Sequence, residues 1–119
     1  PMGRLTTHVL DTARGCPAAG MAFALHLLGP DGSCRVLCRG VTNHDGRADT
    51  PLLQGETMAA GNYELVFEVA AYFAAAGVPQ ADPPFLGSVP LRFGIADTTA
   101  HYHVPLLVSP WSYSTYRGS

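Results

Sequence analysis

Apolar and polar residues alternate with a period of two along much of this chain. The clearest run covers residues 62–69, where Tyr63, Leu65, Phe67 and Val69 share one face. Because successive side chains of a strand point to opposite faces, this pattern predicts a strand with one buried face. Less regular runs predict further strands over residues 5–11, 21–28, 34–41, 84–95, 101–108 and 111–117.

Residues 70–77 break the alternation. They read AAYFAAAG, a run of good helix formers closed by a glycine that suits a helix C-cap. This segment predicts a helix of two turns between two strands. Seven or eight strands separated by glycine- and proline-rich turns are typical of a β-sandwich, and 119 residues are enough for a single domain, residues 1–119.

The composition limits the classes of partner. Apolar residues make up 47% of the chain and charged residues only 13%, which excludes a disordered chain and predicts that a homo-oligomer covers part of the surface. The net charge of −2 lacks the basic excess of a nucleic-acid-binding protein, and the longest apolar runs are too short to span a membrane. All seven cationic residues are arginine, so a lysine Schiff base is excluded.

The three cysteines, Cys16, Cys34 and Cys38, include no CxxC pair. Cys34 and Cys38 are expected on one face of their strand, and further ligands at metal-binding spacing are missing. We therefore expect free thiols, no metal site and a reducing, cytoplasmic location.

Histidine is the most reactive residue type in this weakly charged chain. His101 and His103 are two apart on a predicted strand, so both side chains point to the same face, and His8 lies in the first predicted strand. Imidazoles titrate near neutral pH and suit acid–base catalysis, whereas two histidines without a third ligand make a weak metal site. Arg47 follows a turn, where a solvated cation is the simpler interpretation. We expect no catalytic role for His26 or His44.

Three segments carry a family resemblance: LTTHVLDTARGCPA at residues 5–18, NHDGRAD at 43–49 and HYHVPLLVSPWSYSTYRGS at 101–119. Together they resemble the 5-hydroxyisourate hydrolases, the enzymatic branch of the transthyretin-like proteins. The resemblance implies an all-β sandwich of two four-stranded sheets with one short helix. It also implies a homotetramer, built as a dimer of dimers around a central channel, and no cofactor.

The same resemblance implies the site residues. It places catalytic roles on His8, Arg47 and His103, with His101 as a neighbour that contributes to substrate binding. Tyr116 and Ser119, in the YRGS segment, are implied to close the site around the substrate. The implied reaction opens the ring of 5-hydroxyisourate to give 2-oxo-4-hydroxy-4-carboxy-5-ureidoimidazoline.

Two alternatives belong to other functional classes. A non-enzymatic carrier of small aromatic ligands would use the same channel, but the carrier branch lacks the combination of His8, Arg47, His103 and YRGS that this chain has. An immunoglobulin-like adhesion module would show a Cys…Trp…Cys order, whereas Trp111 follows all the cysteines.

Overall fold

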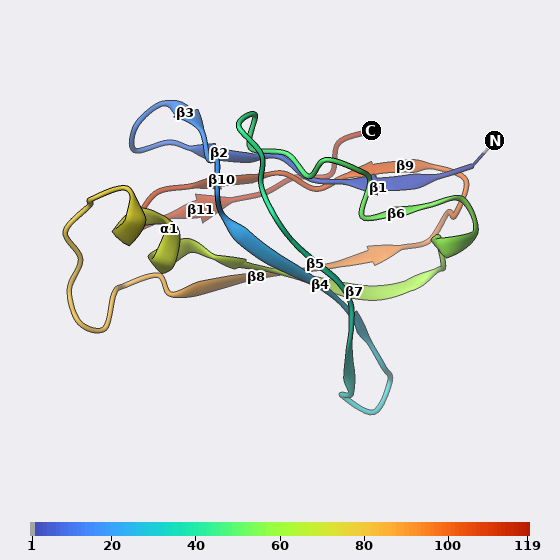
Figure 1. Cartoon of the computed structure of the whole chain (residues 1–119). Coiled ribbons are helices and arrows are strands. Elements are labelled where there is room, and N and C mark those ends of the chain that lie inside the picture. Colours follow the sequence, from blue (N-terminus) through green and yellow to red (C-terminus); the bar gives the residue numbers. More distant parts are fainter. Residues whose placement is uncertain (1) are drawn as a thin grey trace.

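One layer of the fold is a four-stranded antiparallel sheet. The computed structural model describes residues 2–119, and in it the strand order of this sheet is β5-β4-β7-β8 (Figure 1). Its strands are long, because each inner strand pairs with both of its neighbours along nearly its full length. The strands are β4 (Ala22–Leu28), β5 (Cys34–Val41), β7 (Gly61–Glu68) and β8 (Ser88–Ile95).

The second layer consists of two short sheets placed end to end, with orders β6-β1-β9 and β11-β10-β2-β3. In each of them a strand from the start of the chain pairs in parallel with one from its end, β1 with β9 and β2 with β10. The strands are β1 (Arg4–Thr6), β2 (Val9–Asp11), β3 (Cys16–Pro17), β6 (Leu53–Gln54), β9 (His101–His103), β10 (Leu106–Val108) and β11 (Tyr113–Ser114). The predicted β-sandwich is confirmed.

A proline divides the second layer. The sequence predicts single strands over 5–11 and 101–108, but each is split in two at the level of Pro105. Pro105 has no N–H to donate, so the ladder is interrupted there. The N–H groups on either side still pair, Val104 with the carbonyl of Thr6 and Leu106 with that of His8, both at 2.9 Å. The split therefore leaves the two chain segments side by side.

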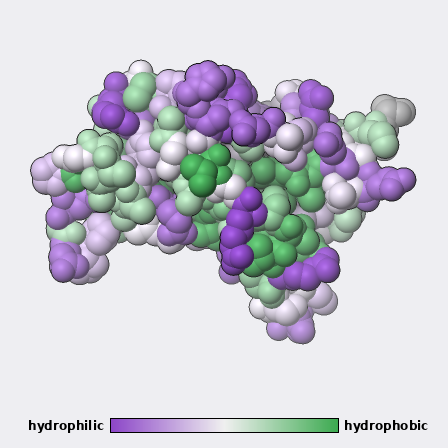
Figure 2. Space-filling view, in the orientation of Figure 1, coloured by the Kyte–Doolittle hydropathy of each residue, from purple (hydrophilic) through white to green (hydrophobic). Residues whose placement is uncertain are grey.

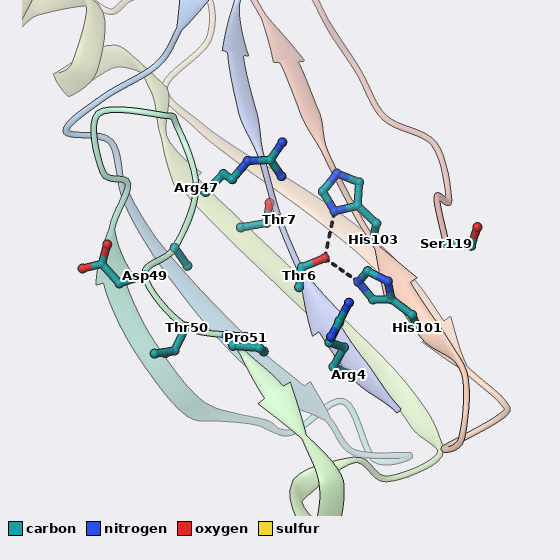
Figure 3. Close-up of a pocket in the computed structure, with 11 residues that line it drawn as sticks. Arg4, Thr6, Thr7, Arg47, Asp49, Thr50, Pro51, His101, His103 and Ser119 are labelled. Atoms are coloured by element: carbon teal, nitrogen blue, oxygen red, sulfur yellow. Dashed lines mark hydrogen bonds between the residues drawn. The ribbon is translucent and has the colours of Figure 1, made fainter. Parts of the chain in front are cut away.

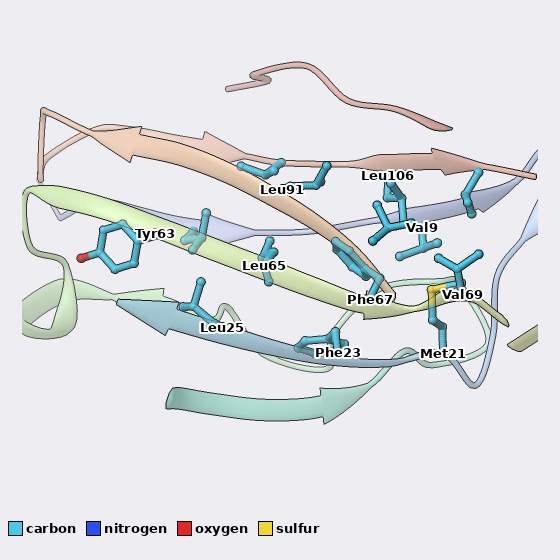
Figure 4. Close-up of a cluster of buried hydrophobic side chains, with 14 of the residues drawn as sticks. Val9, Met21, Phe23, Leu25, Tyr63, Leu65, Phe67, Val69, Leu91 and Leu106 are labelled. Atoms are coloured by element: carbon cyan, nitrogen blue, oxygen red, sulfur yellow. The ribbon is translucent and has the colours of Figure 1, made fainter. Parts of the chain in front are cut away.

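The core lies between the layers and is built from the inward positions of the alternating pattern (Figure 4). Tyr63, Leu65 and Phe67 of β7 are almost completely buried, as predicted, and pack with residues of the other layer such as Val9 and Leu106. Truncation of a buried aromatic residue such as Phe67 to alanine typically costs about 3–5 kcal/mol.

The one α-helix of residues 2–119, α1 (Val69–Ala75), lies where the sequence predicts it, and a 3-10 turn, η1 (Gly55–Thr57), is additional. Gly77 has a positive φ of 81° and its N–H donates to the carbonyl of Ala74, which confirms the glycine C-cap. Val69, predicted as the end of a strand, is instead the first residue of the helix.

An ionic cluster with a buried carboxylate joins α1 to β2. The Asp11 carboxylate accepts hydrogen bonds from Arg14 Nε at 2.9 Å and from the Tyr72 hydroxyl at 2.8 Å. Burial opposes ionisation of Asp11, but these hydrogen bonds outweigh it and hold the pKa of the carboxyl below its usual value. The cluster fixes the end of the strand that follows His8.

Two predicted strands are shorter than the pattern indicates. The strand expected over 84–95 begins only at Ser88, because its partner β7 ends at Glu68, opposite Ser88, where the chain turns into α1. The strand expected over 111–117 is reduced to Tyr113–Ser114, although Gly118 pairs again with His103.

Cys34 and Cys38 do not share a face, contrary to the prediction. The pairing of β4 with β5 shifts by one residue between Leu25 and His26, so that Leu25 pairs with Cys38 and His26 with Val36. A bulge of this kind reverses the facing of every residue beyond it. Cys34 is accordingly exposed and Cys38 partly buried, and all three cysteines are free thiols.

Several large apolar side chains remain on the surface of the protomer. Figure 2 shows apolar areas between polar ones, one of them over the region of β4 and β5. The exposed large apolar residues are Met2, Val36, Val41, Phe85, Trp111, Tyr113 and Tyr116. Within residues 2–119, no helix combines the length and the hydropathy that a membrane crossing requires.

Candidate active site

Arg47 is positioned by a tight turn with a defined hydrogen-bond pattern. The Asn43 side-chain oxygen accepts from the N–H groups of Asp45 and Arg47 at 2.9 and 3.1 Å. The Asn43 N–H in turn donates to the carbonyl of Arg47 at 2.8 Å. This arrangement is an Asx-type turn, which explains why the chain uses asparagine here.

Gly46 allows this turn to lie against β2. Its φ is +76°, and a Cβ at this position would lie 2.4 Å from the carbonyl oxygen of Val9. The Gly46 carbonyl also accepts from the Val9 N–H at 2.7 Å. Only glycine satisfies both the left-handed backbone and the close approach.

His8 lies opposite Arg47, because the two residues form an isolated antiparallel β-bridge. The ring Nε2 of His8 is 2.8 Å from the carbonyl oxygen of Asp45. A carbonyl can only accept, so Nε2 carries the proton and the neutral ring has its free lone pair on Nδ1.

His101 and His103 flank Tyr102 on β9, and the predicted shared face is confirmed. Tyr102 is buried, and its hydroxyl accepts from the N–H groups of Ala96 and Asp97 at 3.1 and 3.0 Å. Both histidine side chains therefore point outward on the opposite face. Their ring centroids are 6.3 Å apart.

Thr6 contacts both of these imidazoles. Its hydroxyl oxygen lies 2.8 Å from His101 Nε2 and 2.8 Å from His103 Nδ1 (Figure 3). The parallel pairing of β1 with β9 brings Thr6 opposite His103.

The pKa values of both imidazoles lie below the ordinary value of 6.5. For His103 the causes are burial and then the charge of Arg47, followed by His101 and His8. For His101 the causes are burial and then Arg4 and Arg117. Both rings are therefore neutral at pH 7, which is the state that a base requires.

These side chains border a hollow of about 390 Å³ on the outer face of the second layer (Figure 3). Arg47 extends beside His103 at one end, and Arg4 lies near His101 at the other. The lining residues are Arg4, Thr6, Thr7, Arg47, Ala48, Asp49, Thr50, Pro51, His101, His103 and Ser119. The lining thus carries two arginines, one aspartate and two imidazoles.

The C-terminal segment is attached to β9. The N–H of Gly118 donates to the His103 carbonyl at 2.7 Å, and the His103 N–H donates to the Gly118 carbonyl at 3.1 Å. These two hydrogen bonds hold the C-terminal segment against β9. Ser119 reaches the hollow, whereas Tyr116 lines a different, apolar hollow together with Tyr102 and Leu91.

The structure thus brings Arg47, His101, His103 and Ser119 to one hollow, with His8 directly beside Arg47. Thr6 and Arg4 line it as well and are not among the residues singled out from the sequence. The period-two alternation places Thr6 on the same face as His8, and this was the signal that could have identified it.

A metal centre finds no support in the part of the chain that the structure describes. No group of three or more histidine, cysteine, aspartate or glutamate side chains is placed there to hold an ion.

The fold and the site together define the class of this protein. It is a β-sandwich with a hollow on one sheet that histidine and arginine side chains line. A family model described as HIUase/Transthyretin family matches residues 5–118. The chain belongs to this family.

The relatives of this chain include enzymes and transthyretins. A 5-hydroxyisourate hydrolase of Ralstonia nicotianae is 59% identical, over 99% of this chain and 100% of the relative. The crystal structure of (S)-allantoin synthase has a TM-score of 0.94 and 51% identity, over 99% of this chain but only 44% of that one. Sea bream transthyretin, solved in complex with thyroxine, has a TM-score of 0.86 and 28% identity, over 97% of this chain and 94% of that one.

Proposed function

We propose that this chain hydrolyses 5-hydroxyisourate to 2-oxo-4-hydroxy-4-carboxy-5-ureidoimidazoline, a reaction of urate degradation. The observation that carries the proposal is the convergence of Arg47 and two neutral imidazoles, His101 and His103, on one hollow, with His8 bridged to Arg47. The high identity to a full-length relative named as this enzyme supports it.

His103 acts as the base in this proposal. Water is a poor nucleophile at neutral pH, and a neutral imidazole can remove its proton as it attacks the ring carbonyl. His103 Nδ1 is bound to Thr6, so Nε2 is the nitrogen available to the substrate side. The proton taken from water is then delivered to the ring nitrogen as the C–N bond breaks, which leaves a carboxyl group and an N–H.

His8 assists by orienting the water. Its Nε2–H is held by the Asp45 carbonyl at 2.8 Å, so the Nδ1 lone pair can accept a hydrogen bond from the attacking water. The same hydrogen bond fixes the ring orientation.

Arg47 binds the substrate and stabilises the oxyanion that forms during attack. The planar fork of a guanidinium matches a planar, carbonyl-rich heterocycle. Since the sequence has no recognisable Ser-His-Asp or Cys-His pattern, direct attack by water is preferred over a covalent intermediate. The roles of Tyr116 and Ser119 in closing the site remain part of the proposal.

We further propose that the working form is a homotetramer, a dimer of dimers. The low charged fraction of 13% and the exposed apolar residues Phe85, Trp111 and Tyr113 support an assembly that covers them. The free thiols fit a reducing compartment, and we propose a cytoplasmic location.

A carrier of small aromatic ligands is the second candidate, because a transthyretin with bound thyroxine shares the fold. The hollow of this chain favours the enzyme, since its lining of Arg4, Arg47, His101 and His103 is polar and cationic.

The deciding experiment follows the ultraviolet decay of freshly generated 5-hydroxyisourate with and without the protein. Acceleration in proportion to enzyme concentration, lost in His103→Ala, is the expected result. A decay rate equal to that without protein, together with tight binding of thyroxine, would favour the carrier.

A further inference from the structure

The hydroxyl of Thr6 lies between two imidazoles and is within hydrogen-bond distance of both. The distances from Oγ1 are 2.8 Å to His101 Nε2 and 2.8 Å to His103 Nδ1 (Figure 3). A threonine hydroxyl has one proton to donate and lone pairs with which to accept. The hydroxyl has only one proton, so the two imidazoles cannot both accept from Thr6, and at least one of them donates its own N–H to the hydroxyl oxygen.

The tautomers of the two histidines are consequently linked. If His103 carries its proton on Nδ1, this proton points to Thr6, and the hydroxyl points to His101 Nε2. His101 then carries its proton on Nδ1. If His101 instead donates from Nε2, the hydroxyl points to His103 Nδ1, and the His103 proton lies on Nε2.

Only the first arrangement leaves His103 Nε2 free as a base. It also needs no rearrangement when Nε2 takes a proton, because the Nδ1–H bond to Thr6 is retained in the imidazolium. In the second arrangement Nε2 already carries a proton and cannot remove one from water.

The permanent charges near the rings are cationic, Arg47 at His103, and Arg4 and Arg117 at His101. The Arg47 cation beside His103 favours the first arrangement, because it stabilises a lone pair on Nε2 better than an N–H there. The carboxylate of Asp49 lines the same hollow but accepts a hydrogen bond from Asn43 at 3.0 Å. A histidine is usually oriented by a partner on its second nitrogen, and here this partner is Thr6.

We propose that Thr6 is a positioning residue that accepts the Nδ1–H of His103 and, together with the Arg47 cation beside the ring, holds the tautomer in which Nε2 is the base of the reaction. This inference rests on the proposed hydrolase function for its catalytic consequence. The tautomer itself is a property of the free protein and can be measured without substrate.

The test compares Thr6→Val, which removes the hydroxyl at nearly constant shape, with Thr6→Ser, which keeps it. Thr12→Val is the matched control, because Thr12 donates to the Val108 carbonyl in the same layer, away from the hollow. Long-range 1H–15N spectra of protein labelled in its histidines report which ring nitrogen carries the proton. Steady-state kinetics over pH accompany the spectra.

The expected spectrum of the unaltered protein has His103 as the Nδ1–H tautomer and keeps it in Thr6→Ser. In Thr6→Val we expect a shift to the Nε2–H form and a fall in kcat of about 10- to 100-fold with little change in KM. The control should leave both unchanged.

An Nε2–H tautomer of His103 in the unaltered protein would overturn the inference, even if Thr6→Val did not fold. So would an unchanged His103 tautomer in a folded Thr6→Val. The expected tautomers in a protein without hydrolytic activity would instead refute the proposed function, so the two failures are distinguishable.

Discussion

The backbones of His8 and Arg47 form a single β-bridge, and the ring of His8 is held by the carbonyl of Asp45 from the same turn. The same turn therefore positions the backbone of Arg47 and the ring of His8. This coupling means that a change in the turn disturbs both side chains, whereas a change in either side chain leaves the other in place.

Loss of either His8 or His103 should impair turnover with the fold intact. His8→Ala and His103→Ala should each lower kcat by about 10²- to 10⁴-fold, because each imidazole acts on the attacking water. Circular dichroism should be unchanged. His101→Ala should cost less than His103→Ala, and the reverse order would show that His101 is the base.

Arg47→Lys should not restore activity. An ammonium group keeps the charge but loses the planar fork, so both kcat and KM should change, as they do in Arg47→Ala. Kinetics of Arg47→Lys close to those of the unaltered protein would mean that Arg47 is only a solvated cation at a turn.

The pH dependence of activity should follow the neutral form of His103. Burial and the charge of Arg47 keep the pKa of His103 below 6.5, so the acid limb of kcat/KM should have its midpoint below pH 6.5. Arg47→Ala removes a cation and should move this midpoint upward. A midpoint above 6.5 in the unaltered protein would contradict the assignment.

Stability should depend on pH in the same window. An unfolded histidine takes up its proton near pH 6.5, while His101 and His103 stay neutral in the fold to lower pH. The unfolded state then binds more protons, so the free energy of unfolding falls as the pH drops below 6.5. Urea titrations should show this fall, and it should be smaller in a variant with both residues changed to glutamine.

Gly46→Ala should affect stability and activity together. The positive φ costs about 1–3 kcal/mol for a non-glycine residue, and the clash with the Val9 carbonyl must displace the turn that carries Arg47. Gly32→Ala is the matched control, because Gly32 has a φ of +82° but nothing within 4 Å of its Cβ position. Urea titrations should show a loss of stability in both variants. Only Gly46→Ala should also lose kcat/KM, and equal activity in the two would show that Arg47 does not depend on this turn.

The C-terminal segment should matter for activity more than for folding. Residues 116–119 contribute no buried side chain, so a chain without them should fold. Its activity should fall sharply, because the deletion removes Ser119 from the hollow and frees the backbone of His103. Light scattering should give about four times 12.6 kDa for the intact protein. Normal kcat/KM after deletion, or a fully active monomer, would refute this part of the proposal.

Much of the fold is predictable because one rule, alternation with a period of two, governs residues such as Tyr63, Leu65 and Phe67. The exceptions have local causes that the alternation of apolar and polar residues does not reveal. Pro105 splits two long strands, and a one-residue bulge sends Cys34 and Cys38 to opposite faces. Neither the bulge nor the parallel pairing of β1 with β9 has a signature in the order of residues.

The candidate site, like the fold, is predictable from the sequence only in part. His8, Arg47 and His103 are recognisable from short motifs, and the structure places them together. Thr6 is different, since its importance depends on a hydroxyl lying between two rings that follow it by most of the chain length. Such a contact comes from strand pairing and is visible only in three dimensions.

The parallel pairing of β1 with β9 also has a kinetic consequence. In the sheet β5-β4-β7-β8, β4 pairs with the next strand β5, β7 pairs with the next strand β8, and β4 pairs with β7 across β5 and β6, whereas β1 and β9 must close a loop that spans almost the whole chain. Long-range pairings of this kind carry a larger loop-closure entropy and are slow to form. We therefore expect refolding to restore most of the circular dichroism signal before it restores hydrolysis. A molecule caught between these steps would have much of its core and no working imidazoles.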